Sequence, residues 1–275
     1  MKLMNKLKIS QVQFQASHIP ALNAEILEKS FNRTLKFKPH LICTPECSNM
    51  ITNDKNYLIT NAPYQNTCPV LKMAKDFAKK NKITINLGSL LLKIKNQRKL
   101  VNRSYFINNN GVVEKTYDKI HMFDVTLKNG ESYKESDFYS SGKELKMTNV
   151  LGHSIGHTIC YDLRYPKMFR ALAKKGSQII VVPSAFTRTT GKAHWHSLIK
   201  ARAIENGVFI LAPNQWGVNN EKRVTYGHTL IVDPWGETLA EAEDGEMIIA
   251  AELDLNRVRE CQNAIPVLDN DRNFD

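Results

Sequence analysis

The first half of the chain alternates between hydrophobic patterns typical of strands and of helices. Hydrophobic and polar residues alternate over residues 8–14, as expected of a strand with one buried face. A helix is predicted to begin at Pro20, because Leu27, Phe31 and Leu35 recur at every fourth position. The same reasoning predicts a helix at 70–80, a buried strand at 83–91, and a hairpin whose strands 105–107 and 112–115 flank the turn at 108–111.

The second half continues this alternation without a Ser-, Gly- or Pro-rich linker. A helix is predicted from Cys160 to Lys175, ended by Gly176, and another over 194–205. Strands are predicted at 178–182, 208–212, 228–232 and 247–253. Two β-rich halves, each with its own helices, indicate a single α/β domain over residues 1–275 in which two sheets pack face to face with helices outside. Its core is expected to span about residues 7–262, followed by a C-terminal tail at 263–275.

The first candidate for chemistry is Cys160, which closes the apolar run 154–159 and opens a polar turn. A side chain held where a buried strand ends projects into a cleft while the sheet fixes its backbone, which is the placement of many catalytic nucleophiles. Cysteine is also a small hydrophobic residue that is common in cores. Cys160 alone therefore does not decide between a nucleophile and a core residue.

A thiol needs a group that removes its proton, and the chain offers a carboxylate and an ammonium in comparable positions. Glu46 ends the apolar run 41–45, and Lys119 stands where a strand-like alternation enters an aromatic loop. Taken singly, each is equally compatible with an ordinary charged residue at a strand end.

Together, in the order Glu46, Lys119 and Cys160, these residues and their flanks resemble the nitrilase superfamily of carbon-nitrogen hydrolases. The resemblance runs from Lys8 to Val267 and implies a four-layer α-β-β-α sandwich that usually forms a homodimer. Its most specific stretches are Pro45-Glu46, residues 119–124, 160–166, 183–187, 191–195, 201–206 and 226–228, and Val232-Asp-Pro-Trp-Gly236.

The resemblance implies a Glu-Lys-Cys triad, and amide hydrolysis explains what each member does. Glu46 takes the thiol proton as Cys160 attacks and then protonates the departing nitrogen. Lys119 and the backbone N–H of Tyr161 stabilise the oxyanion, and a thioester at Cys160 is then hydrolysed by water. A second glutamate of the family corresponds to Glu135, with Glu131 as the nearby alternative in a loop that is rather short for the family.

Substrate class is harder to predict, because amide, nitrile, carbamoyl and acyl-transfer branches share the triad. The stretches 183–187, 201–206 and 233–236 are most similar to the branch that contains deaminated glutathione amidase, with the omega-amidase branch, acting on 2-oxoglutaramate, as the alternative. Both substrates are small anionic amides, so an arginine is expected in the pocket. Candidate substrate-binding residues are Tyr161, Phe186, Thr187, Arg164 and Arg188.

The formal net charge of +11 raises the alternative of a nucleic-acid or protein binder without activity. Lysines are spread along the chain and interleaved with acids, so general solubility and an enriched anionic substrate explain the charge better than specific nucleic-acid binding. The N-terminus is too charged for a signal peptide, and no run reaches the ~20 apolar residues of a membrane span, so a cytoplasmic enzyme is expected.

No cofactor or metal is expected. Five cysteines, an odd number, suit a reducing compartment. Cys43 and Cys47, after His40, lack the further ligands of a structural zinc site. His194 and His196 stand at i and i+2 of a predicted helix and should point to different faces. A metal-dependent amidohydrolase that uses scattered histidines stays open as an alternative, to be separated from a thiol hydrolase by a chelator.

Overall fold

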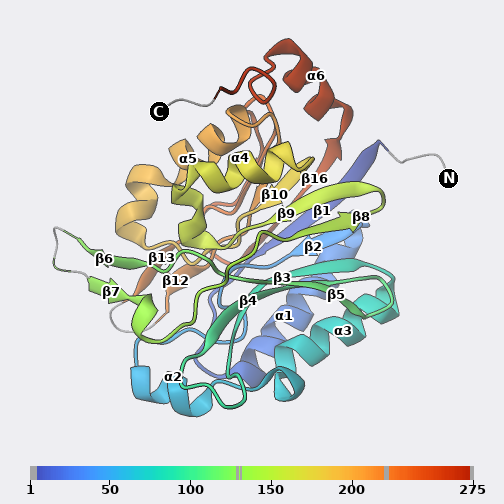
Figure 1. The fold of residues 1–275 in the computed structure, drawn as a ribbon. Helices are drawn as coiled ribbons and strands as arrows, with labels where there is room; N and C mark the ends of the chain where they lie inside the picture. The colour runs from blue at the N-terminus through green and yellow to red at the C-terminus, as the bar shows by residue number, and fades with distance from the viewer. Residues whose placement is uncertain (1–4, 128–129, 131, 220–222, 273–275) are drawn as a thin grey trace.

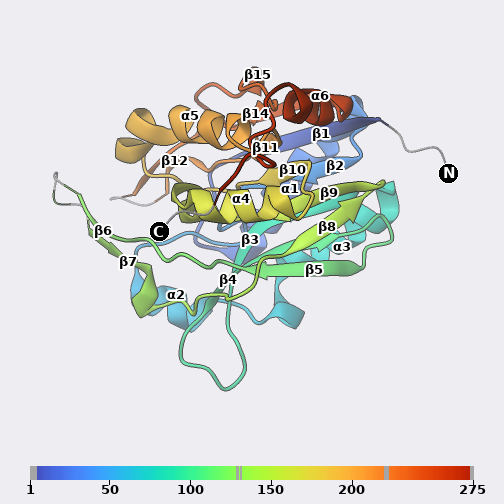
Figure 2. The ribbon, with the colours of Figure 1, turned by 45° about the horizontal axis from the view of Figure 1, so that its top comes forward.

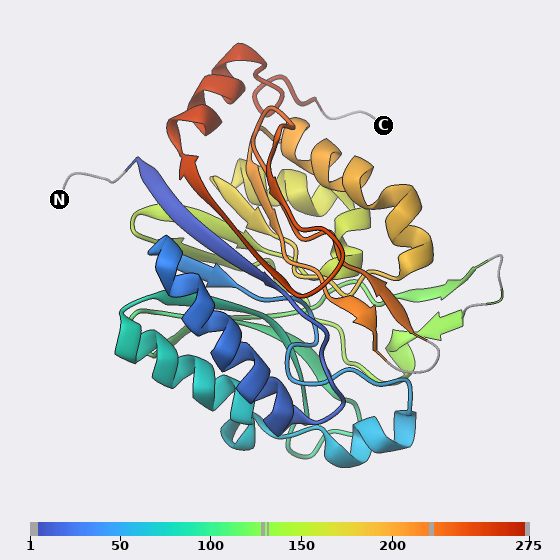
Figure 3. The same cartoon turned by 180° about the vertical axis from the view of Figure 1, so that it is seen from behind.

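The computed structural model describes residues 5–127, 130, 132–219 and 223–272. These residues form two six-stranded sheets packed face to face, with helices on both outer surfaces (Figure 1). The turned views show α1 and α3 side by side on one outer face and α4 and α5 on the other (Figures 2 and 3). The predicted α-β-β-α sandwich is therefore confirmed.

The first sheet contains a parallel centre with antiparallel strands at both edges. In spatial order its strands are β16 (Met247–Asp254), β1 (Lys6–Gln13), β2 (Leu41–Cys43), β3 (Thr84–Leu92), β4 (Val101–Ile107) and β5 (Val113–Asp118).

The second sheet repeats this plan, because β9, β10 and β11 are parallel and their outer neighbours are antiparallel. In spatial order its strands are β15 (Thr238–Glu241), β14 (Leu230–Val232), β11 (Phe209–Ala212), β10 (Ile179–Val181), β9 (His153–His157) and β8 (Met147–Val150).

Helices and two short ribbons complete the structure. The helices are α1 (Pro20–Thr34), α2 (Lys55–Asn61), α3 (Pro69–Asn81), α4 (Pro166–Lys174), α5 (Arg188–Ile204) and α6 (Asn256–Ala264), with short 3-10 turns at Leu35–Phe37, Gln65–Thr67, Glu135–Asp137 and Cys160–Arg164. The ribbons are β6 (Asp124–Thr126) with β7 (Ser132–Lys134), and β12 (Trp216–Val218) with β13 (Val224–Tyr226).

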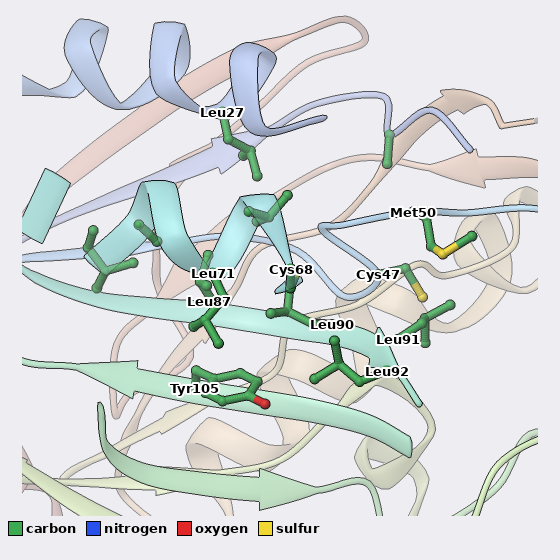
Figure 4. Packing of buried hydrophobic residues seen from close by; sticks show 14 of the residues in the cluster. Leu27, Cys47, Met50, Cys68, Leu71, Leu87, Leu90, Leu91, Leu92 and Tyr105 are labelled. Atoms are coloured by element: carbon green, nitrogen blue, oxygen red, sulfur yellow. The ribbon is translucent and has the colours of Figure 1, made fainter. Parts of the chain in front are cut away.

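The core consists of three hydrophobic layers, and the alternation along each strand decides which layer a side chain enters. On β10, Ile179 and Val181 pack between the sheets, whereas Ile180 faces the helices α4 and α5. The third layer lies between the first sheet and helices α1 and α3, where Leu27, Leu71 and Leu87 belong to one hydrophobic cluster (Figure 4). Burial on both faces explains why these strands have nearly continuous apolar sequences.

Two sequence predictions differ from the structure. The strand predicted at 247–253 was assigned to the second half, but β16 pairs antiparallel with β1 in the first sheet. The helix predicted from Cys160 to Lys175 is a 3-10 turn followed by a separate helix, α4, which begins at Pro166. The proline ring disfavours the helical conformation for the residue before it, and Tyr165 accordingly has φ −111° and ψ 88°.

Each helix in the described part of the chain is too short or too polar to cross a lipid bilayer.

Candidate active site

The predicted triad residues meet where strands of the two sheets end. Glu46 follows β2, Lys119 follows β5, and Cys160 follows β9. β2 and β9 both belong to the parallel parts of their sheets, and the carboxyl ends of parallel strands are the usual place for a site in an open α/β sheet. Each sheet therefore supplies part of the site.

Lys119 is buried between two carboxylates. Its Nζ lies 2.9 Å from Oε1 of Glu46 and 2.8 Å from Oε2 of Glu135. The side chains of Lys119 and Glu46 are 0% and 2% exposed, whereas that of Glu135 is 17% exposed. Glu135 is fixed in turn by the backbone N–H of Phe123, which donates to its Oε2 at 2.9 Å.

The two carboxylate oxygens of Glu46 are held by groups from both sheets. Asn102 Nδ2 donates to Oε1 at 2.8 Å, and the backbone N–H of Ala185 donates to Oε2 at 2.8 Å. The Glu46 carbonyl also accepts a bond from Gln215 Nε2 at 3.0 Å. The carboxylate thus has a fixed orientation, as a proton-transfer group requires.

Cys160 occupies a sharp turn directly after its strand. Its φ is 49°, in the left-handed region that non-glycine residues seldom adopt, and its N–H donates to the Pro183 carbonyl at 2.9 Å. The residue is 9% exposed, and the Glu46 carboxylate lies close enough to its thiol to raise the thiol pKa. This is the arrangement of a strand-to-helix nucleophile turn.

Burial and neighbouring charges determine the protonation states of the three groups. Burial, reinforced by the negative charge of Glu46, raises the pKa of the Cys160 thiol well above its usual range. Burial alone would raise the pKa of Glu46, but the charge and hydrogen bond of Lys119 lower it below the usual value. For Lys119, burial opposes the charged form, but Glu135 and Glu46 outweigh it and raise the pKa. The resting site is therefore a neutral thiol beside an ionised glutamate and a lysine ammonium.

Asp162 connects the cysteine turn to the lysine loop. Its fully buried carboxylate accepts from the backbone N–H of Ile159 at 2.8 Å and from the Tyr117 hydroxyl at 2.6 Å. It also accepts from the backbone N–H of His121 at 3.0 Å. One side chain thus holds residues on both sides of Lys119 together with the residue before Cys160. Asp162 lies within residues 160–166, one of the stretches that resemble the family, but the sequence alone does not indicate its role as an anchor.

Four of the residues predicted to bind substrate line the pocket above Cys160, namely Tyr161, Arg164, Phe186 and Thr187. Arg164 lies over the Phe186 ring, with the guanidinium carbon 5.3 Å from the ring centroid. Its Nη2 is 3.3 Å from Nδ1 of His194. Thr187 is the N-cap of α5, where its side chain accepts from the backbone N–H of Thr190.

Arg188 does not line this pocket. It is exposed at the start of α5 and lines a separate cavity with Trp216 and Tyr226, because the helix turns successive side chains in different directions. Its prediction as a substrate-binding residue therefore needs correction. Glu131, the alternative to Glu135, lies outside the described residues.

Arg223 is a pocket residue that the sequence reasoning missed. It lies just before β13, lines the Cys160 pocket, and donates from Nη2 to the Ala185 carbonyl at 3.2 Å. Burial opposes its charge, but Cys47, Glu46 and Glu135 keep the pKa of the guanidinium above the usual value. A short basic pair before a strand carries no local signal of a site, so only the fold could identify it.

Three of the described residues lie close enough together to hold a metal ion. His196, His228 and Glu241 have ligand atoms within 4.8 Å of one another, and Oε1 of Glu241 is 2.8 Å from His196 Nε2 and 2.9 Å from His228 Nδ1. These residues are absent from the lining of the Cys160 pocket. His194 contacts Arg164 instead, so the two helix histidines do point in different directions.

Comparison with known proteins agrees with this geometry. The family model of carbon-nitrogen hydrolases matches residues 12–263. The chain is 35% identical over 273 residues to deaminated glutathione amidase of Dictyostelium discoideum, covering 96% of this chain and 94% of that protein. It is 36% identical over 234 residues to deaminated glutathione amidase of Yersinia enterocolitica, covering 84% and 82%.

Solved structures give the same result. The C. elegans NitFhit protein is 32% identical with a TM-score of 0.91, covering 97% of this chain and 65% of that one, so this chain spans just under two thirds of NitFhit. Nit3 of Saccharomyces cerevisiae, a member of the nitrilase superfamily, is 28% identical with a TM-score of 0.86, covering 96% of each chain. The chain therefore belongs to the carbon-nitrogen hydrolase family of the nitrilase superfamily and is a hydrolase of amides.

Proposed function

We propose that Cys160 is the nucleophile of this hydrolase and Glu46 its general acid and base. Glu46 takes the thiol proton while the sulfur attacks the amide carbonyl, and returns it to the departing nitrogen. Lys119 and the backbone N–H of Tyr161 stabilise the oxyanion, and Glu135 holds Lys119 in place. Glu46 then activates the water that hydrolyses the thioester.

The observation that carries this proposal is the fixed carboxylate of Glu46, which shares a pocket with Cys160 and has its Oε1 2.9 Å from Nζ of Lys119. Because the resting thiol is neutral, the attack requires a base within hydrogen-bond reach, and Glu46 is such a base. The lysine ammonium is too strongly held in its charged form to act as the base, so an electrostatic role suits it better.

We further propose that the substrate is a small anionic amide, with deaminated glutathione first and 2-oxoglutaramate second. Support comes from the relatives in Dictyostelium and Yersinia, which bear the name deaminated glutathione amidase. Arg164 and Arg223 both line the pocket and could neutralise a carboxylate. The net charge of +11 would also favour the approach of an anion.

The test is Cys160-dependent release of 2-oxoglutarate from each of the two amides. Wild type is compared with Cys160→Ala and Glu46→Gln, and Arg33→Gln on the exposed face of α1 serves as a surface control. We expect both site variants to lose at least about 100-fold in kcat. Preference for 2-oxoglutaramate would favour the omega-amidase alternative, and turnover that survives Cys160→Ala would refute the thiol mechanism.

We also infer a single domain, a cytoplasmic location and a homodimer. Exposed apolar residues support an interface, because Ile204, Trp235 and Ile265 are each more than half exposed and line one cavity of about 230 Å³. Light scattering on the purified chain tests the homodimer, and a monomer at all concentrations would contradict it.

A further inference from the structure

A second, larger cavity adjoins the Cys160 pocket. Its volume is about 500 Å³, and it shares Phe123, Glu135 and Arg223 with that pocket. Cys160, Phe186 and Thr187 line the pocket and are absent from the described lining of the larger cavity. The two spaces therefore meet at a boundary formed by the shared residues.

The proposed chemistry indicates which half of a substrate enters the larger cavity. Glu46 must face the departing nitrogen in order to protonate it. Cys47, the next residue in the chain, lines the larger cavity, and so does Asn102, which donates to Glu46 at 2.8 Å. The acyl carbon is instead bound to Cys160, which lines the smaller pocket. The leaving group should therefore extend toward Cys47 and Asn102, into the larger cavity.

The charges of the larger cavity favour an anion. Among its described lining residues, Lys55, Lys134 and Arg223 are basic, and Glu135 is the one acid. Glu135 is already paired with Lys119 at 2.8 Å. Three basic residues against one acid leave the described wall with an excess of positive charge.

Arg223 is the best-placed donor of this wall. Its Nη2 is anchored to the Ala185 carbonyl, and its buried Nε has no hydrogen-bond partner within the described part of the chain. The guanidinium carbon lies 5.9 Å from the centroid of the Tyr133 ring, so an aromatic face restricts its orientation. A buried N–H without a partner is costly, and a carboxylate of the substrate would satisfy it.

We propose that the larger cavity is the leaving-group subsite and that Arg223 binds a carboxylate carried by the departing amine. This inference rests on the proposed thiol amidase function. A leaving-group subsite of this size favours a substituted amide over a primary amide, because ammonia needs a volume of only ~30 Å³, similar to that of a water molecule. A volume of about 500 Å³ instead lies within the range of ordinary small-molecule pockets.

The experiment compares three substrates that share the 2-oxoglutaryl half. They are deaminated glutathione, its C-terminal carboxamide, and 2-oxoglutaramate, whose leaving group is ammonia. For wild type we expect kcat/KM to be about 10- to 100-fold higher for the carboxylate than for the carboxamide. Arg223→Gln should abolish this preference through KM, because it should lower kcat/KM for the carboxylate substrate at least about tenfold more than for the carboxamide or for 2-oxoglutaramate. Arg33→Gln, an exposed substitution of the same type, should behave as wild type.

The outcomes separate the subsite from the function on which it rests. Equal losses on all three substrates in Arg223→Gln would overturn the subsite, because Arg223 would then serve the acyl half or the fold. Cys160-dependent cleavage by wild type without any preference for the carboxylate would also overturn it while leaving the amidase function intact. No Cys160-dependent cleavage of any substrate would overturn both.

A binding measurement on wild type keeps the inference testable if Arg223→Gln does not fold. Cysteinylglycine, the product amine, should inhibit the enzyme, and cysteinylglycinamide should inhibit at least about tenfold more weakly. Equal inhibition by the two amines would overturn the role assigned to the leaving-group carboxylate.

Discussion

His157 should make the stability of this protein depend on pH in mildly acidic solution. It is the last residue of β9, three residues before Cys160, and its side chain is fully buried. The Phe106 ring lies 4.6 Å away, and Nε2 is 2.7 Å from the Thr148 hydroxyl. Burial, together with the charge of Lys115, lowers the pKa of the imidazole to about 3.

The size of the effect follows from proton linkage. An unfolded histidine binds a proton below pH ~6.5, whereas folded His157 stays neutral until about pH 3. The unfolded state thus binds more protons in this window, and the free energy of unfolding falls as the pH falls, by about 1.4 kcal/mol per pH unit. From pH 6.5 to 4.5 the loss from this residue is about 2 kcal/mol, because half of the unfolded molecules are already protonated at pH ~6.5. Its contribution is fully retained only well above pH ~6.5.

The assay is urea denaturation of wild type and His157→Leu between pH 4.5 and 7.5. Leucine cannot titrate but loses the Thr148 hydrogen bond, so at pH 7 the variant should be about 1 kcal/mol less stable. Wild type should lose this advantage on acidification, and the plots of unfolding free energy against pH for the two proteins should cross at pH ~5.5. His18→Leu, the same substitution at an exposed position, serves as the control. A constant difference between wild type and His157→Leu across the pH range would refute the reasoning.

Three further predictions concern the site directly. Asp162→Asn should lower kcat by about 100-fold with little change in KM, because the cysteine turn and the lysine loop lose their common anchor; an unchanged kcat would contradict this. Gly88→Ala should lower the melting temperature and the activity together, because the new Cβ would lie 2.0 Å from the Thr44 carbonyl oxygen and 2.5 Å from Pro183 Cβ, and overpacking costs about 1–3 kcal/mol or more. Iodoacetamide should inactivate the enzyme through Cys160 whereas EDTA should leave the rate unchanged, and inactivation by EDTA would favour the metal-dependent alternative.

Local sequence patterns predicted most elements because each strand and helix buries a face defined by its own residues. Short apolar runs placed β3 and β11 within one residue of their observed starts. The partner of a strand is a long-range property, however. Nothing in residues 247–254 indicates pairing with β1, which lies more than 230 residues earlier in the chain.

The site shows the same division between local and long-range information. Glu46, Lys119 and Cys160 could be predicted because each stands at a strand end within a specific motif. Arg223 and Asn102 could not, because their roles depend on contacts between distant strands. Arg188 was expected in the pocket because an anionic substrate calls for an arginine, but α5 begins at this residue and directs its side chain to a separate cavity.

The buried charges of the site argue for function rather than stability. Lys119 and Glu46 are 0% and 2% exposed, and taking two such charges out of water costs several kcal/mol per ion before their attraction repays it. Apolar residues of similar volume often stabilise a fold as well as a buried ion pair does. The fold has no need of this pair, yet it fixes Glu46 with Asn102 and the Ala185 N–H and fixes Lys119 with Glu135. Such fixed charges are useful where a reaction develops charge in a water-poor pocket, because they stabilise it without reorganising. Replacing Glu46, Lys119 and Glu135 together with Gln, Met and Gln should therefore abolish activity while leaving the urea midpoint close to that of wild type. A large loss of stability in the triple variant would show that these charges serve the fold.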